Sequence, residues 1–386
     1  MRTLTILVLA LVATSLALSQ EEVIRIPGEV YFVSAETQRA VYYNSPLTLN
    51  SQPPAGIRVP EWASKGCRYG TLKLGRPLQQ WHFVIAPEML RAVVDMNRNN
   101  DLTDDPVLVG TSWELSEQTY APVRLTVSLN GKLCTRYFSI LYINGRAYLY
   151  ANDLRRFSGT VNGQTFQMTV IDGNADGAFD TPSRSRWEGD RCYLSDSGAR
   201  ASGQDTPIPR LYRAGDRYYR LKVYPDGSVC ELRPSDLTIA TVKTNYPSVK
   251  LTLIGKEVGF WEAEATEGTL QLPADEYTVS AYSVLTKDAQ GTLWGLEVHT
   301  REEMKLKLSG STETFLHLPD SLVVSLGVGS RVKQDTLDIS LVLQPAGQRF
   351  HQVTGLSRNG DLPPPPTLRI VDKTGRTVKV EKFHYG

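Results

Sequence analysis

The sequence has little of what marks an enzyme or a nucleic-acid-binding protein. Its 42 Lys and Arg balance 41 Asp and Glu, giving a formal charge of +1, so no overall field favours nucleic acid or an anionic membrane surface. A Gly-x-Ser-x-Gly elbow, a phosphate-binding loop and a dinucleotide fingerprint are all missing. The histidines show no metal-ligand spacing: His82, His299, His317, His351 and His384. We therefore expect no catalytic activity and no nucleic-acid partner.

Cysteine is scarce, and its spacing excludes a zinc ribbon or a Cys-x-x-Cys redox motif. The four cysteines are widely separated: Cys67, Cys134, Cys192 and Cys230. An even number in an oxidising compartment favours disulfides. Pairing neighbours, Cys67 with Cys134 and Cys192 with Cys230, keeps each bridge within one predicted domain. The alternative is free buried thiols that act as small apolar side chains.

Long apolar runs are absent after the N-terminus. Arg2 precedes an apolar stretch at residues 4–13, and small residues follow at 17–19, which is the pattern of a secretory signal peptide cleaved before Gln20. An uncleaved membrane anchor is the alternative, but the stretch is shorter than the roughly 20 residues of a spanning helix. No later segment could span a membrane. We expect a secreted, periplasmic or cell-surface protein with no membrane span after signal cleavage.

Helix patterns are nearly absent, whereas alternating apolar and polar residues are frequent. Runs such as Val23–Ile26 and Val123–Val127 alternate as half-buried strands do. Pairs that tolerate the positive φ of type I′ hairpin turns lie between such runs: Asn130-Gly131, Asn144-Gly145, Asn162-Gly163 and Asp226-Gly227. The sequence predicts an all-β, multi-domain protein of antiparallel sheets and β-sandwiches, with acidic loops between strands.

A chain of 386 residues is too long for one compact core. We expect a signal peptide and three β domains, at 1–19, 20–135, 136–236 and 237–386. The last is expected to be a β-sandwich, Ig-like or prealbumin-like. Within it, Leu272–Val279 resembles the Leu-Pro to Tyr-Thr-Val turn of prealbumin-like modules in exported proteins, a resemblance that covers one hairpin. Four prolines at 363–366 lead into a final hairpin.

The strongest chemical signal is the acidic stretch Asp95–Asp105, which we call the first loop. With Asp95 as position 1, oxygen-bearing side chains stand at positions 1, 3 and 5, as in an EF-hand loop that wraps a hard cation. Asn100 at position 6 tolerates the positive φ of the sharp turn, and Leu102 at position 8 is the inward apolar residue. The candidate calcium ligands are Asp95, Asn97, Asn99, Asp101 through its carbonyl, Thr103, Asp104 and Asp105.

A second copy spans Asp172–Asp180, the second loop. Gly177 occupies its turn position and Phe179 its apolar position. The candidate calcium ligands are Asp172, Asn174, Asp176, Ala178 through its carbonyl, and Asp180. Each loop follows a strand-like run, 91–94 or 166–171, instead of a helix. We therefore interpret the two as a duplicated strand-plus-loop element.

Both loops lack the bidentate Glu that EF-hands carry at position 12. The residues there are Pro106 and Ser183. Substitutes within reach are Asp104 or Asp105 in the first loop and Asp190 or Glu188 in the second. Such loops suit a structural ion bound at roughly 10⁻⁴–10⁻³ M, as in extracellular modules. Ordinary solvated turns are also rich in Asp, Asn and Gly. Two copies of the loop, each with an apolar residue at position 8, favour calcium binding.

On these features the chain resembles a group of exported bacterial β-rich proteins of unassigned activity. Their Asp-x-Asn-x-Asp-Gly-x-Phe-x-Asp loops lie between strands and are related to dockerin-type calcium motifs. The likeness rests on the two loops, on Trp187-Glu188-Gly189-Asp190 and on the terminal Phe383-His384-Tyr385-Gly386. It implies calcium, export and a β architecture, and it implies no activity.

We expect an exported calcium-binding protein with a structural or recognition role. The first alternative is a carbohydrate-binding surface protein, whose partners would be glycans or cell-surface components. Aromatic side chains that could stack on sugars are Trp62, Trp81, Trp113, Trp187, Trp261 and Trp294. The second alternative is a calcium-dependent hydrolase with an unrecognised site, because no pair among the acidic residues stands out as two facing carboxylates.

Overall fold

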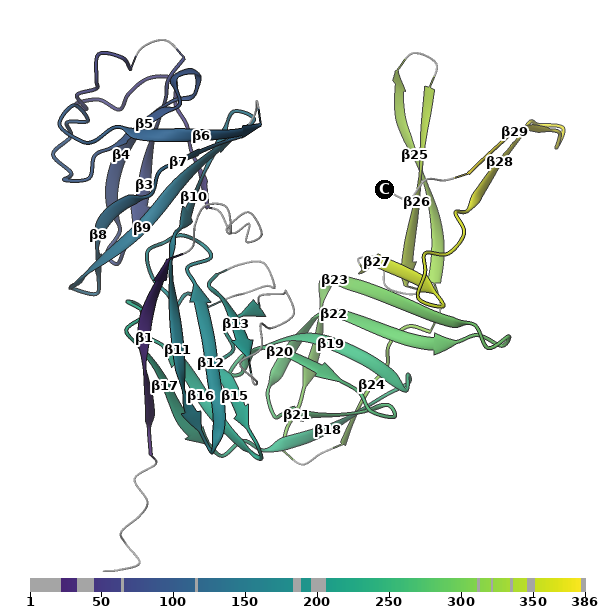
Figure 1. The fold of residues 1–386 in the computed structure, drawn as a ribbon. Helices are drawn as coiled ribbons and strands as arrows, with labels where there is room; N and C mark the ends of the chain where they lie inside the picture. Colours follow the sequence, from purple (N-terminus) through teal and green to yellow (C-terminus); the bar gives the residue numbers. More distant parts are fainter. Residues whose placement is uncertain are drawn as a thin grey trace, which may run out of the picture. The chain divides into compact units, whose positions relative to one another are not determined.

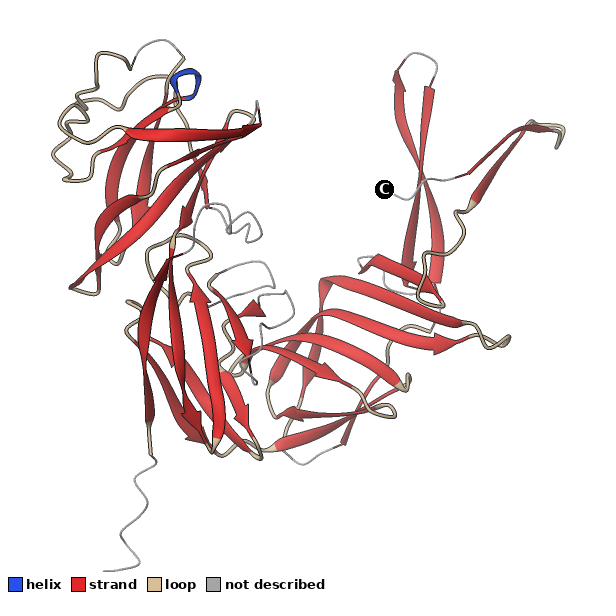
Figure 2. Ribbon diagram, viewed as in Figure 1, coloured by secondary structure: helices blue, strands red, loops and turns tan. Residues whose placement is uncertain are grey.

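The computed structural model describes residues 22–32, 45–63, 66–114, 117–182, 189–195, 206–310, 313–320, 322–333, 336–345 and 351–382. Regular structure in these ranges is β-strand apart from a short 3-10 turn, η1 (Pro87–Met89) (Figure 2). The all-β prediction is confirmed. None of the helical structure in these ranges is long and apolar enough to cross a membrane. The signal peptide predicted at 1–19 lies outside the described residues.

The chain forms two compact units, residues 1–236 and 237–386. The domain boundary expected after residue 135 is wrong, because it falls inside one continuous strand, β9 (Lys132–Ile143). The N-terminal strand β1 (Ile24–Phe32) also pairs with strands that follow residue 150. The first unit therefore holds two sheets that share segments from both expected domains.

The first sheet of this unit has nine strands in the order β2-β10-β9-β7-β6-β5-β4-β3, with β8 paired to β9 (Figure 1). Besides β9, they are β2 (Ser45–Leu47), β3 (Arg68–Leu74), β4 (Gln79–Ala86), β5 (Arg91–Val94), β6 (Leu108–Glu114), β7 (Glu117–Tyr120), β8 (Val123–Leu129) and β10 (Arg146–Ala151). As predicted, Asn130-Gly131 and Asn144-Gly145 have positive φ at both residues. These tight turns join β8 to β9 and β9 to β10.

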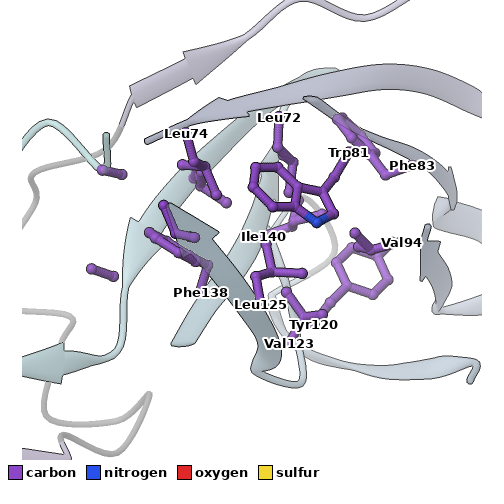
Figure 3. Packing of buried hydrophobic residues seen from close by; sticks show 14 of the residues in the cluster. Leu72, Leu74, Trp81, Phe83, Val94, Tyr120, Val123, Leu125, Phe138 and Ile140 are labelled. Atoms are coloured by element: carbon purple, nitrogen blue, oxygen red, sulfur yellow. The ribbon is translucent and has the colours of Figure 1, made fainter. Parts of the chain in front are cut away.

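Strand β4 is buried on both faces, which explains its nearly continuous apolar sequence. Trp81 and Phe83 point into the main core, where they lie near side chains of β8 and β9 (Figure 3). Ile85 belongs to the same cluster. The alternate residues Val84 and Ala86 pack into a smaller cluster on the opposite face. Leu102 of the first loop belongs to that second cluster, so the loop helps to cover this face of the sheet.

The second sheet has eight strands in the order β14-β13-β12-β11-β1-β17-β16-β15. Besides β1, they are β11 (Asp153–Val161), β12 (Gln164–Ile171), β13 (Arg191–Ser195), β14 (Thr206–Pro207), β15 (Leu211–Ala214), β16 (Arg217–Val223) and β17 (Val229–Ser235). Strand β1 changes partner along its length: Ile24–Pro27 pairs with β17, and Gly28–Phe32 pairs with β11. A Cβ on Gly28 would lie 2.1 Å from the Gly227 carbonyl oxygen, so the crossing point requires glycine.

The four predicted hairpin turns do not share one geometry. Asn162-Gly163, between β11 and β12, has positive φ at both residues. Asp226-Gly227 differs, because only Gly227 has positive φ, and the type I′ prediction is wrong there. Pro225 fixes a negative φ at the start of the turn, and the Gly227 N–H donates to the Tyr224 carbonyl. The result is a type I turn followed by a left-handed glycine.

The C-terminal unit contains a three-stranded and a five-stranded sheet. The first comprises β21 (Thr269–Pro273), β18 (Ile239–Thr244) and β24 (Glu313–Leu316), with β18 and β24 parallel. The second comprises β20 (Gly259–Glu264), β19 (Ser248–Gly255), β22 (Glu276–Lys287), β23 (Leu293–Lys307) and β27 (His351–Arg358). Two hairpins complete the unit: β25 (Leu322–Lys333) with β26 (Thr336–Pro345), and β28 (Thr367–Val371) with β29 (Thr377–Lys382).

The segment Leu272–Val279 does not form the expected hairpin. Its two strands belong to different sheets, since β21 pairs with β18 while β22 pairs with β19 and β23. Asp275, almost fully buried, turns the chain between them by accepting N–H groups of Glu257 and Val258, both at 2.9 Å. The motif thus marks a crossing between sheets.

Candidate metal centre

The first loop leaves β5 with its opening carboxylate already buried. Asp95 is 1% exposed, and its N–H donates to the His82 carbonyl of β4 at 2.8 Å. At position 8, Leu102 is fully buried, as predicted, and its N–H donates to the Arg58 carbonyl at 2.9 Å. The loop is therefore held at both ends by the sheet and by the segment around Arg58.

Within the first loop, side-chain oxygens accept successive backbone N–H groups. The two oxygens of Asp95 accept from Asn99 (3.1 Å) and Asn100 (3.0 Å). Asn97 Oδ1 accepts from Asn99 (3.0 Å), and Asn99 Oδ1 accepts from Asp101 (2.8 Å). Asn100 has the positive φ predicted for position 6, at 67°. The network turns the chain around positions 1, 3 and 5, the positions that supply ligands in an EF-hand loop.

The second loop repeats this network position by position. Asp172 accepts from Asp176 (3.1 Å) and Gly177 (2.9 Å). Asn174 accepts from Asp176 (3.3 Å), and Asp176 accepts from Ala178 (2.8 Å). Phe179 at position 8 is fully buried and donates to the Pro225 carbonyl. The two loops are therefore the same local structure, built on different strands.

One shared feature was not anticipated from sequence. Position 4 also has positive φ in both loops, at Arg98 (60°) and Ala175 (49°). Neither residue is a usual left-handed residue, so nothing in its identity marks the conformation. It follows from the hydrogen bonds on either side, which fix the chain between positions 3 and 5.

In each loop the chain returns so that a later aspartate accepts the backbone N–H of position 2, just after the strand from which the loop starts. Asp105 Oδ1 accepts the N–H of Met96, position 2, at 3.0 Å. Asp190 Oδ1 accepts the N–H of Gly173, the same position of the second loop, at 3.2 Å. Of the substitutes for position 12, the structure thus brings Asp105 and Asp190 to equivalent places. Glu188 and Ser183 lie outside the described residues.

Asp105 and Asp190 differ in their hydrogen-bond partners. Asp190 is fully buried, and its second oxygen accepts the Thr181 N–H at 2.6 Å. The second oxygen of Asp105 is buried and, in the described part of the chain, has no hydrogen-bond partner. Burial raises the pKa of Asp105 to about 6, and the charges of Asp95 and Asp104 add to the rise.

The remaining side chains of the first loop gather around Asp104. This exposed carboxylate accepts the amides of Asn99 at 2.8 Å and Asn97 at 3.3 Å. Asp101 is paired with the exposed Arg58 at 3.0 Å and accepts both the N–H and the hydroxyl of Thr103. Among the described residues, this is the one ion pair of the loop's carboxylates, so negative charge is in excess.

The second loop is instead neutralised by arginines from elsewhere in the unit. Arg136 of β9 is fully buried and contacts Asp172 at 3.0 Å and Asp153 at 2.8 Å. It also donates to the Gly177 carbonyl. Arg76 pairs with Asp180 at 2.7 Å and with Asp176 at 3.4 Å. Neither arginine was identified from sequence, because they lie far from the loop along the chain.

Several other predicted groups do not come together as expected. None of the four cysteines forms a disulfide, so the disulfide prediction is wrong. Cys67 and the half-buried Cys134 pack against different apolar clusters. No row of exposed tryptophans is present in the described ranges: Trp81 is fully buried, and Trp62, Trp261 and Trp294 are half-buried. The side chain of Trp113 and the whole of Trp187 lie outside these ranges.

Within the residues that the structure describes, no group of three or more His, Cys, Asp or Glu side chains is placed to hold a metal ion. A calcium loop of this type draws in addition on amide, hydroxyl and backbone oxygens, which the first loop supplies. Comparison with known proteins gives no further guidance, because no protein-family model, curated protein or solved structure matches the chain.

Proposed function

We propose that the first loop binds Ca²⁺ and that this ion stabilises the N-terminal unit of an exported structural or recognition protein. The observation that carries the proposal is the buried, unpartnered second oxygen of Asp105. A buried carboxylate oxygen without a donor is costly. A hard cation is the partner that a site rich in carboxylates and amides would take.

The residues of the loop divide into ligands and supports. Asp95, Asn97 and Asn99 would present side-chain oxygens, and Asp101 would present its carbonyl. Thr103 or Asp105 would complete the set, and Asp104 adds charge beside it. The bound ion would supply the positive charge that the exposed Arg58 alone does not provide.

A structural ion also fits the position of the loop. Leu102 packs on the sheet only if the loop keeps its turn, and Asp95 ties that turn to β4. Neutralising the carboxylates favours the turned conformation of the loop, so ion binding and folding of the loop would be coupled. The loop joins β5 to β6 and is not flanked by a pair of helices that ion binding could separate, which suits a structural ion and not a signalling switch.

The test is a calcium titration of the purified protein with Asp105→Asn as the paired variant. The asparagine keeps an oxygen for the Met96 N–H but removes the charge. We expect calcium binding in the wild type and a loss of most of the affinity in the variant. Equal binding by both proteins, or none by the wild type, would contradict the proposal.

The proposal includes export, on the basis of the signal-peptide pattern at residues 1–19. The matching measurement is the N-terminal sequence of the native protein, with a start at or near Gln20 expected. The carbohydrate-binding alternative has less support, because the described tryptophans form no exposed platform. No observation favours a hydrolase.

A further inference from the structure

We infer that Arg136 is the built-in cation of the second loop, so that the duplicated element binds one calcium ion per chain and not two. The inference rests on the proposed calcium site in the first loop. Two arginines pair with carboxylates of the second loop, and the inference assigns the difference between the loops to the fully buried one, Arg136 of β9, and not to the partly exposed Arg76.

The guanidinium of Arg136 is surrounded by oxygens that would otherwise suit a metal ion. It donates to Asp172 Oδ2 (3.0 Å), Asp153 Oδ2 (2.8 Å) and the Gly177 carbonyl. Two of these acceptors are carboxylates and one is a backbone carbonyl, the oxygen types that calcium prefers. Asp172 is the carboxylate at position 1 of the loop, so the arginine pairs with the first of the candidate calcium ligands.

The arginine is fixed in this place by packing as well as by charge. Its side chain has no solvent exposure, and its guanidinium carbon lies 4.0 Å from the ring centre of Phe179. Stacking on an aromatic face suits a guanidinium. Although burial lowers the pKa of Arg136, Asp153 and Asp172 raise it above its ordinary value, so the group stays charged.

The first loop has no equivalent of this arginine. Among the described residues, Asp95 accepts only backbone N–H groups. Arg98, the nearest cation in the sequence, lies over the ring of Trp81 at 5.2 Å. Arg58 pairs with Asp101 at the exposed side of the loop and not with Asp95.

The consequence is a difference in what each loop can accept. A calcium ion entering the second loop would have to displace a buried guanidinium from three acceptors and leave that charge without partners, which is strongly unfavourable. If the guanidinium of Arg136 stayed in place, the calcium ion would bind beside a like charge. An ion entering the first loop meets excess negative charge and an unpartnered buried oxygen.

The experiment counts calcium ions bound per chain by equilibrium dialysis of the intact protein, at roughly 1–10 mM calcium to cover the affinities of extracellular sites. We expect one ion for the wild type, none for Asp95→Asn and one for Asp172→Asn. Two ions for the wild type, falling to one in Asp172→Asn, would overturn the inference while leaving the proposed function in place. No ion for the wild type would contradict the proposed function, and the count of one ion per chain with it, whereas two ions would contradict the inference only.

A gain-of-binding variant tests the same idea in the opposite direction. Arg136→Met removes the guanidinium from Asp172 and from the Gly177 carbonyl, while Asp153 keeps its pair with Arg155, and we expect the count to rise from one to two. The matched control is Arg155→Met, which removes a guanidinium from the same Asp153 (3.0 Å) without touching Asp172, and it should stay at one. A folded Arg136→Met protein, judged by its circular dichroism and melting curve, that binds only one ion would overturn the inference.

Discussion

The guanidinium of Arg136 and the carboxylate of Asp172 lie 3.0 Å apart, and neither side chain is exposed to solvent. They come from different sheets of the N-terminal unit, since Arg136 stands on β9 and Asp172 directly follows β12. The pair therefore joins the two sheets at the second loop. Its contribution to stability can be measured independently of any metal.

Removing one partner of this pair should be costly. Arg136→Met leaves Asp172 as a buried, unpaired charge, and we expect the free energy of unfolding to fall by about 3–5 kcal/mol. The matched control is Arg58→Met, which breaks the exposed pair with Asp101 and should change stability by no more than about 1 kcal/mol. Urea denaturation in chelator measures both variants. Similar losses in the two would show that the buried pair has no special role.

Calcium should raise the melting temperature of the wild-type protein by a few degrees. At calcium roughly tenfold above the dissociation constant, binding to the folded state alone adds about 1.4 kcal/mol. Asp105→Asn should melt at a higher temperature than the wild type in chelator, because an unpaired buried charge is gone, yet lose the response to calcium. Asp172→Ala combined with Asp176→Ala should keep the response, although its basal stability falls. Melting curves with calcium and with chelator decide among these outcomes.

Acid should weaken the attachment of β1 through Glu231. Hydrogen bonds from Arg233 (2.6 Å) and Tyr224 (3.1 Å), and a further one from Arg25, lower the pKa of Glu231 below its ordinary value of 4.5. A carboxylate with a lowered folded-state pKa adds stability above its unfolded pKa, and this is lost as the pH falls through the folded value. Glu231→Gln should reduce stability at pH 7 and flatten its dependence on pH below about 4.5. Parallel curves for variant and wild type would contradict this assignment.

The thiols should remain reduced and largely unreactive in the native protein. Cys67, Cys192 and Cys230 are buried, and burial, with a further effect from Cys192, raises the pKa of Cys230. We expect a thiol reagent to reach Cys134 first and the other three only after unfolding, with four thiols titrated in denaturant without reductant. Fewer than four would point to a disulfide that the structure does not contain.

The features predicted correctly from sequence are those set by neighbouring residues. The loops form because the oxygen of position 1 reaches N–H groups four and five residues later, and the Asn-Gly turns need only two residues in the left-handed region. The Asp226-Gly227 turn was mispredicted because the preceding proline, one residue outside the motif, changes the geometry.

The charge balance of the second loop could not be predicted in the same way. Arg136 is 36 residues from Asp172, and Arg76 is 100 residues from Asp176. Arg136 does not differ in its local sequence from the other arginines of alternating strands, and Arg76 lies in the turn between β3 and β4, where its neighbours do not mark it as a charge partner. Their roles depend on which strands become neighbours, and the expected boundary after residue 135 placed Arg136 at the start of a domain instead of inside a strand.

The change of partner along β1 has a consequence for the order in which the N-terminal unit is assembled. The residues Ile24–Pro27 pair with β17 and Gly28–Phe32 pair with β11, although β1 is synthesised before both of these strands. Contacts between segments so distant in the chain form slowly. Synthesis from the N-terminus therefore cannot complete this eight-stranded sheet until Ser235 has been made, and a chain truncated before β17 would keep β1 paired only at Gly28–Phe32.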